Sequence, residues 1–216
     1  MTGRFITFEG GEGAGKSTQL RRLAVRLEAL ETGQCDGITV TREPGGSAGA
    51  EEIRNLVLGG AGGRWDMMTE LLLIYAARRD HLRRTIWPAL QAGRWVLCDR
   101  FEDSSRAYQG MAGGLGLETV DRLGGIVRGD FAPDLTLILD LPVPVGRARV
   151  QGRALEQAQA PDHIEARGSD FHEAVRAGFL TLAENEPNRC RVIDASAGVD
   201  AVEAAIWAAV SARFEL

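Results

Sequence analysis

The stretch Gly10-Gly11-Glu12-Gly13-Ala14-Gly15-Lys16-Ser17 decides the fold of this 216-residue chain. It is a complete G-x-x-x-x-G-K-[ST] motif, in which glycines let backbone N–H groups curl around phosphate oxygens at the start of a helix. The flanking sequence has the order that such a loop requires. Residues 4–9 form a short apolar run typical of a buried strand, and leucines recur at helical spacing from residue 20 onward. We therefore predict a phosphate-binding P-loop between a strand and a helix.

The basic residues of the chain point to the same motif. Of 25 basic residues 24 are arginines, and the only lysine is Lys16. An ammonium group is a compact point charge that reaches the β- and γ-phosphates inside the curl, whereas a planar guanidinium would overfill it. The next residue, Ser17, offers a hydroxyl to Mg²⁺, which bridges these phosphates in this class of site. We predict a site for a triphosphate, with Mg²⁺ as the cofactor.

Short apolar runs alternate with helical patterns along the rest of the chain. This alternation predicts an α/β fold of the P-loop NTPase type, with a doubly wound, mostly parallel five-stranded sheet and helices on both faces. The length suits a single P-loop domain, 1–216, in which residues 146–168 have poor hydrophobic periodicity and are predicted to be a short lid. Strands are expected near 4–9, 38–41, 95–98, 135–139 and 192–193, and helices near 20–30, 51–58, 66–92, 118–128, 170–185 and 199–213.

Bulk properties argue against several classes of partner. The formal net charge of -5 disfavours a nucleic-acid polymer, which requires a strongly basic surface. Residues 1–8 lack a charged segment followed by an apolar stretch, and no apolar run approaches the ~18 residues that span a bilayer. We expect a cytoplasmic protein with small-molecule partners and no membrane partner.

Charged residues follow the predicted strands at their carboxyl ends, the edge where ligands bind in open α/β sheets. Asp99 comes directly after the run 95–98, the position from which a second acidic residue helps to hold the P-loop metal and its waters. For the acids after the last two strands, an equally good explanation is that the chain simply reaches water there. The residues at these ends are Glu9, Arg42, Glu43, Asp99, Arg100, Asp140 and Asp194.

Motifs in a fixed order resemble the bacterial thymidylate kinase family over nearly the whole chain. The resemblance implies phosphorylation of dTMP to dTDP with ATP and Mg²⁺, in dTTP biosynthesis, by a homodimer. The matching segments are Phe8-Glu9-Gly10 through Thr18, Thr41-Arg42-Glu43-Pro44-Gly45-Gly46, Asp99-Arg100-Phe101 with Ser104-Ser105, Ala107-Tyr108-Gln109-Gly110, Tyr75-Ala76-Ala77-Arg78, Asp170-Phe171-His172 and Ile193-Asp194-Ala195-Ser196.

On the donor side, the resemblance implies a role for each matching residue. Arg100 matches the arginine that spans the donor and acceptor phosphates, a task suited to a bidentate fork. Arg153 is our choice for the lid arginine that adds positive charge on closure, in company with the acidic loop residue Glu12. The predicted catalytic residues are Lys16, Arg100, Arg153, Glu9 and Asp99. The predicted ATP-binding residues are Gly10, Gly11, Glu12, Gly13, Ala14, Gly15, Lys16, Ser17, Thr18, Arg149, Arg153 and Ala195. The predicted metal ligands are Ser17, Asp99 (directly or through water) and Glu9.

On the acceptor side, Arg42 and Arg54 match positions near the phosphate, although Arg54 also fits a solvated helix face. Arg78 falls on an apolar stripe and should point inward, where its partner is either a base carbonyl or a structural ion pair. Ile74 stands where the family usually places an aromatic residue that stacks on thymine. The predicted dTMP-binding residues are Glu9, Arg42, Glu43, Pro44, Arg54, Ile74, Arg78, Arg100, Ser105, Tyr108 and Gln109.

Two lid positions depart from the family, because His163 and Gln151 replace frequent arginines. Two other functions also remain open. One is a kinase for another nucleotide or for a nucleoside, which the arginines disfavour because an uncharged acceptor needs no cation. The other is a regulatory P-loop NTPase, which the absence of an Asn-Lys-x-Asp motif disfavours.

Overall fold

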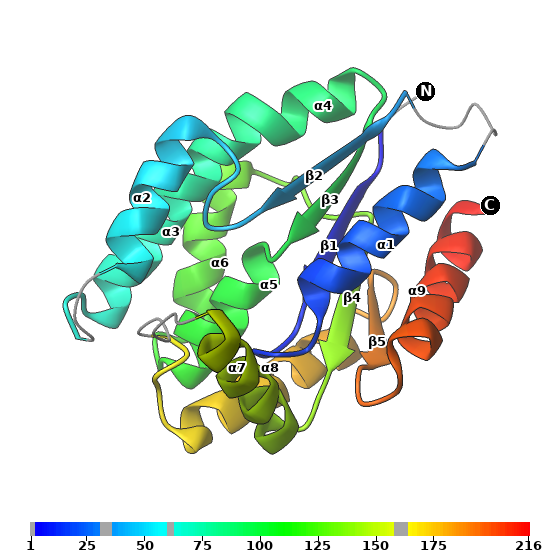
Figure 1. Ribbon diagram of the computed structural model, residues 1–216. Coiled ribbons are helices and arrows are strands. Elements are labelled where there is room, and N and C mark those ends of the chain that lie inside the picture. Colours follow the sequence, from blue (N-terminus) through cyan, green and yellow to red (C-terminus); the bar gives the residue numbers. More distant parts are fainter. Residues whose placement is uncertain (1–2, 31–35, 60–62, 158–163) are drawn as a thin grey trace.

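Five strands form one parallel sheet in the order β2-β3-β1-β4-β5 (Figure 1). The computed structural model describes residues 3–30, 36–59, 63–157 and 164–216. Every pairing among these strands is parallel, so the prediction of a mostly parallel five-stranded sheet is confirmed, with no antiparallel pair. The strands are β1 (Phe5–Glu9), β2 (Ile38–Arg42), β3 (Trp95–Asp99), β4 (Leu135–Asp140) and β5 (Cys190–Asp194).

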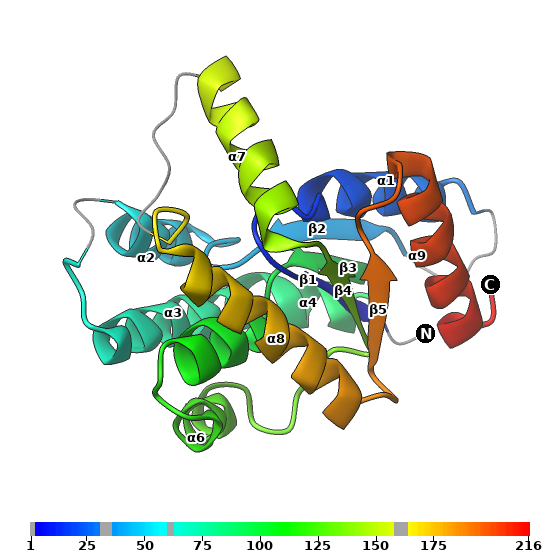
Figure 2. The same cartoon turned by 90° about the horizontal axis from the view of Figure 1, so that it is seen from below.

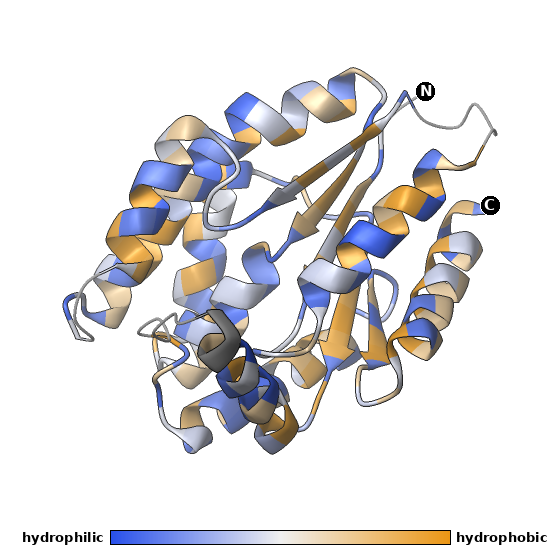
Figure 3. Ribbon diagram, viewed as in Figure 1, coloured by the Kyte–Doolittle hydropathy of each residue, from blue (hydrophilic) through white to orange (hydrophobic). Residues whose placement is uncertain are grey.

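Helices cover both faces of the sheet, which is why its central strands read as continuous apolar runs (Figures 2 and 3). On one face α1 and α9 pack against each other and against the sheet, and α4 and α8 lie on the opposite face. The helices are α1 (Lys16–Glu28), α2 (Ala48–Leu58), α3 (Met67–His81), α4 (Trp87–Gln91), α5 (Glu102–Ser105), α6 (Leu117–Arg128), α7 (Val143–Gln157), α8 (Ser169–Asn185) and α9 (Val199–Phe214). Within the described ranges, no helix has the length and apolar character needed to cross a bilayer.

The predicted helix over 66–92 is interrupted. Asp66 caps its start by accepting a hydrogen bond from the Thr69 backbone N–H at 2.6 Å, and α3 then runs into a π-helical turn, η1 (Leu82–Ile86), before α4. The turn lies just ahead of Pro88. A proline has no N–H to donate and its ring clashes with the carbonyl four residues earlier, so the helix widens there. A second π-helical turn, η2 (Arg106–Ala112), continues α5 and was not predicted.

The strand register brings the predicted charged residues to one edge of the sheet. Asp99 is paired with Phe8 of β1 and with Arg42 of β2, so the ends of β1, β2 and β3 lie together. Asp140 and Asp194 are paired at the ends of β4 and β5. Those two acids have structural partners, since Asp140 accepts two hydrogen bonds from Arg176 and Asp194 accepts two from Ser196.

The segment predicted to be the lid begins inside a helix. Helix α7 starts at Val143 and stands away from the sheet (Figure 2). Its base lies directly on the P-loop, because a side chain on Gly13 would overlap the backbone of Gly146, and one on Gly146 would overlap the carbonyl of Glu12. Both glycines therefore permit a close approach of two backbones. His163 lies outside the described residues.

Candidate active site

A cavity of about 510 Å³ opens at the carboxyl edge of the sheet. Its walls come from the P-loop, the ends of β2 and β3, and helices α2, α3, α5 and η2, with α7 and the segment before α8 at the rim. Most of the predicted site residues line it. They are Glu12, Gly13, Ala14, Gly15, Lys16, Ser17, Thr18, Arg42, Glu43, Pro44, Arg54, Ile74, Arg78, Asp99, Arg100, Ser105, Tyr108, Gln109 and Arg153.

The ammonium group of Lys16 is held inside the P-loop. Lys16 is the first residue of α1 and is 7% exposed. Its Nζ donates to the carbonyl oxygens of Gly10 at 3.1 Å and of Gly11 at 2.9 Å. Burial lowers the pKa of Lys16, and the nearby Arg100 guanidinium lowers it further. An anion that enters the loop would relieve both costs, so the site is electrostatically prepared for phosphate.

The predicted metal ligands Ser17 and Asp99 meet at the end of β3. The Ser17 hydroxyl donates to the Asp99 carboxylate at 2.6 Å. Within the residues that the structure describes, no three histidine, cysteine, aspartate or glutamate side chains gather as a metal site made of protein alone. One hydroxyl and one carboxylate nevertheless fit magnesium, which binds proteins through few oxygens and takes its other ligands from phosphates and water.

Arg100 bridges the P-loop and the helical segment after β3. Its backbone has φ 71°, a left-handed conformation that is costly for a residue with a side chain and marks a functional constraint. One nitrogen, Nη2, donates to Glu12 at 2.6 Å and to the Tyr108 hydroxyl at 3.2 Å. The other, Nη1, donates to the Gly10 carbonyl at 3.2 Å and to Ser104 at 3.1 Å. The guanidinium also lies over the Tyr108 ring.

Glu12 is the counter-ion of both Arg100 and Lys16. Burial alone would raise the pKa of its carboxyl, but the Arg100 guanidinium and the Lys16 ammonium lower it to about 2. The Tyr108 hydroxyl also donates to Glu12, at 2.9 Å. The carboxylate is therefore ionised at neutral pH and orients Arg100 before any substrate is bound.

Glu9 lies beneath the cavity and does not line it. Its side chain is completely buried, and its two oxygens accept hydrogen bonds from the Phe101 backbone N–H at 2.8 Å and from the Ser104 hydroxyl at 2.6 Å. These bonds fix the turn that carries Arg100. Burial raises the pKa of Glu9 to about 7, with a further contribution from the Asp103 carboxylate.

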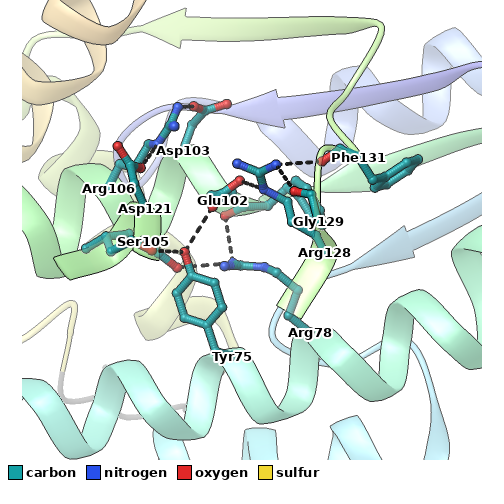
Figure 4. Close-up of polar contacts among 12 residues, drawn as sticks. Tyr75, Arg78, Glu102, Asp103, Ser105, Arg106, Asp121, Arg128, Gly129 and Phe131 are labelled. Atoms are coloured by element: carbon teal, nitrogen blue, oxygen red, sulfur yellow. Dashed lines mark hydrogen bonds and ion pairs between the residues drawn. The ribbon is translucent and has the colours of Figure 1, made fainter. Parts of the chain in front are cut away.

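Arg78 has the structural ion pair that the sequence left as one of two alternatives. It is 1% exposed, and its Nε donates to Glu43 at 2.7 Å. Its Nη2 donates to the Phe101 carbonyl at 3.0 Å and to Ser105 at 3.1 Å, and Figure 4 shows the side chain reaching from α3 toward Ser105 beside Tyr75. Its Nη1 is buried with no hydrogen-bond partner within the described part of the chain. Nη1 is therefore available to donate to a base carbonyl, the second of the two alternatives.

The buried Glu43 carboxylate contacts both Arg78 and His81. Burial would raise its pKa, but the Arg78 guanidinium and His81 lower it. His81 contacts Glu43 through Nδ1 at 3.0 Å and Thr41 through Nε2 at 2.7 Å. This buried chain of contacts fixes the end of β2 against α3.

The two arginines predicted near the acceptor phosphate lie at the mouth of the cavity. Arg42 is exposed and pairs with Glu51 at 3.1 Å, an ion pair of the weak surface kind. Arg54 donates to the Pro44 carbonyl at 2.8 Å, so it lies on the site rather than on a purely solvated helix face.

Four of the predicted ATP-binding residues, Gly10, Gly11, Arg149 and Ala195, lie next to the cavity rather than in its lining. Arg149 of α7 donates to the carbonyl of Gly13 at 3.4 Å and to that of Ala195 at 3.3 Å, which joins the P-loop to the end of β5. Arg153, one turn further along α7, lines the cavity. Gly10 and Gly11 lie behind the loop as acceptors for Lys16.

Some lining residues were not predicted as site residues. Arg21 lies one turn after Ser17 and donates to its carbonyl at 3.0 Å, so its i+4 spacing from the motif was a usable signal. Phe101 and Ser104 belong to a segment that carries the family resemblance. Leu58, Ile164 and Glu165 have no local signature, because only the tertiary fold brings them to the cavity. The full set is Arg21, Leu58, Phe101, Ser104, Ile164 and Glu165.

Comparisons with known proteins agree with this geometry. The thymidylate kinase family model matches residues 8–206. The chain is 53% identical to the thymidylate kinase of Caulobacter vibrioides, with 99% of each chain covered. It is 51% identical to that of a Bradyrhizobium species, with 98% of this chain and 91% of that protein covered. It also resembles the crystal structure of thymidylate kinase from Ehrlichia chaffeensis, with a TM-score of 0.76 and 32% identity over 98% of this chain and 99% of that chain.

The raised pKa of Glu9 predicts a pH-dependent effect on stability. Between its ordinary value of 4.5 and about 7, the folded protein holds a proton that the unfolded chain releases. The contribution of Glu9 is therefore fully present below pH 4.5 and is lost as the pH rises through about 7. Glu9→Gln removes this loss, so its free energy of unfolding relative to the parent should increase from pH 5 to pH 8.

Urea denaturation at the two pH values measures this difference. Glu118→Gln, on the exposed face of α6, is the matched control and should change little between them. A Glu9→Gln variant whose stability relative to the parent is the same at both pH values would contradict the assignment.

Proposed function

We propose a residue-by-residue account of catalysis for this chain, which belongs to the thymidylate kinase family. It is an ATP-dependent nucleoside monophosphate kinase that phosphorylates dTMP to dTDP. The observation that carries our account is the meeting of the P-loop with the end of β3, where Lys16 and Arg100 lie in one cavity with Glu12 between their charges. The roles below follow from the position of each side chain.

In the proposed transfer step, an oxygen of the dTMP phosphate attacks the γ-phosphorus of ATP. The bond to the β–γ bridging oxygen breaks, and ADP leaves with that oxygen. Little covalent help is needed, so catalysis depends on position and on positive charge near the equatorial oxygens. Lys16 supplies charge on the donor side, and Arg100 exchanges its bonds to Glu12 and Tyr108 for oxygens of the two substrates.

Magnesium completes the donor site in this proposal. The Ser17 hydroxyl and the Asp99 carboxylate, already 2.6 Å apart, would hold the ion directly or through water. When bound, the ion would supply positive charge to the donor phosphates. Arg149 of α7 contacts the P-loop at the Gly13 carbonyl, and Arg153 lines the cavity. We propose that closure of the lid over 146–168 brings Arg153 toward the transferred group and excludes water.

For the acceptor, we propose that Arg42 and Arg54 bind the dTMP phosphate. The weak Arg42–Glu51 pair is exposed and can be exchanged for a phosphate at little cost. Thymine would lie against Ile74, with Tyr108 at the wall and with Arg78 and Gln109 beside its polar edge. Buried donors and acceptors without partners are costly, and the base supplies both kinds of partner.

An acceptor panel tests this function. ADP release from ATP is measured with dTMP, dUMP, dCMP, dGMP, AMP and thymidine. We expect release with dTMP, weaker release with dUMP, and loss of activity when magnesium is chelated. Release only with another acceptor would contradict the thymidylate assignment, and slow release without any acceptor would indicate a regulatory NTPase.

We also propose that the enzyme is a homodimer that pairs through α2, α3 and α6. Helix α3 packs between the other two. Large apolar side chains are exposed on all three helices, with Met68 and Leu72 one turn apart on α3. Leu56 on α2 and Ile126 on α6, which is 79% exposed, are further exposed apolar side chains on these helices. The proposed location is the cytoplasm, in keeping with phosphorylated substrates that do not cross membranes unaided.

Leu72→Glu tests the pairing, because a charge at the centre of the apolar surface must lose its water in the dimer. Light scattering after size exclusion should give twice the mass of one chain for the parent and a single-chain mass for the variant. Val25→Glu, at an even more exposed apolar position on α1, should remain dimeric. A monomeric parent, or a dimeric Leu72→Glu variant, would contradict this interface.

A further inference from the structure

Two rows of side chains face each other across the inner end of the cavity. Glu70, Ile74 and Arg78 lie four residues apart on α3, and all three are buried. Ser105 and Gln109, also four residues apart, face them from α5 and η2. The rows are joined at both ends, by Arg78 Nη2 to Ser105 at 3.1 Å and by Gln109 Nε2 to Glu70 at 2.8 Å.

The contact with Glu70 determines which way the Gln109 amide points. An ionised carboxylate only accepts hydrogen bonds, so the NH₂ group of Gln109 must face Glu70. The second oxygen of Glu70 pairs with Arg167 at 2.9 Å, and that guanidinium lies over the Phe171 ring. The amide therefore has one favoured orientation, and the carboxylate that imposes it has its own counter-ion.

The opposite end of the amide is left for a ligand. Gln109 lines the cavity, and its Oε1 is buried with no hydrogen-bond partner among the described residues. The same holds for Nη1 of Arg78, four residues beyond Ile74 on the facing row. Among the described residues, the inner cavity thus presents an acceptor and a donor that have no protein partner and that a complementary base edge can pair.

We infer that Glu70 is a positioning residue that selects the base, by holding Gln109 so that it offers an acceptor and not a donor to the cavity. This inference rests on the proposed binding of dTMP at the same site. Thymine and uracil place a ring N–H next to a carbonyl, which complements Gln109 Oε1 and Arg78 Nη1. Cytosine places an unprotonated ring nitrogen next to an amino group and would meet like groups at both positions.

Glu70→Gln tests the orientation with almost no change in volume. A glutamine at position 70 presents either an oxygen or an NH₂ group, so it no longer forces one orientation on Gln109. The ratio of kcat/KM for dTMP to that for dCMP should then fall about tenfold, the size of one misdirected buried hydrogen bond. The kcat at saturating dTMP should stay within about twofold of the parent, because the phosphate contacts are intact.

Three comparisons separate this role from a general loss of structure. In Glu70→Gln, the ratio of kcat/KM for dTMP to that for dUMP should not change, since both bases present the same N–H and carbonyl. In Glu118→Gln, at an exposed glutamate on α6, the ratio of kcat/KM for dTMP to that for dCMP should equal that of the parent. In a Gln109→Met background, Glu70→Gln should have no further effect on the dCMP ratio, because Glu70 acts through Gln109.

A parent-like dTMP to dCMP ratio in Glu70→Gln would overturn the inference, as would an equal fall in the Gln109→Met background. A parent that fails to phosphorylate dTMP would overturn the proposed function and the inference together. A crystal structure of the parent with dTMP requires no variant to fold. It should show the base N–H on Gln109 Oε1 with Nε2 on Glu70, and a base N–H on any other group would overturn the inference.

Discussion

The structure depends on two cations held close together at the edge of a sheet before any anion is bound. Lys16 is buried against two carbonyl groups of the P-loop, and Arg100 is fixed by Glu12, Tyr108 and Ser104. Burial lowers the pKa of Lys16, and the neighbouring Arg100 guanidinium lowers it further. Phosphate oxygens would relieve the repulsion between Lys16 and Arg100, so the folded protein favours phosphate-bearing ligands at this edge before any is bound.

The parallel sheet is what brings these cations together. Because β1 and β3 are neighbours, the loop after one and the turn after the other share a single edge. Glu9 holds the turn from below through hydrogen bonds from Phe101 and Ser104, and burial in that position raises its pKa. These hydrogen bonds hold the backbone next to Arg100, which has an unusual left-handed conformation.

Much of the fold and of the candidate site could be predicted from the sequence, because short-range patterns specify them. The motif at 10–17 and five apolar runs were enough to predict the sheet and its binding edge. The π-helical turns and the helical start of the lid region were missed, since both depend on how the chain packs and not on periodicity. The partners of Arg78 and Gln109 could not be chosen in advance, because Glu43 and Glu70 reach them only through the tertiary fold.

The most direct test of the account is the turnover of Lys16→Met at saturating ATP and dTMP. Methionine keeps the length of the side chain and removes its charge, and the chain has no other lysine to replace it. We predict that kcat falls by about 10²–10³-fold, the usual effect of removing one group that stabilises transition-state charge. A Lys16→Met enzyme that turns over as fast as the parent would contradict the account.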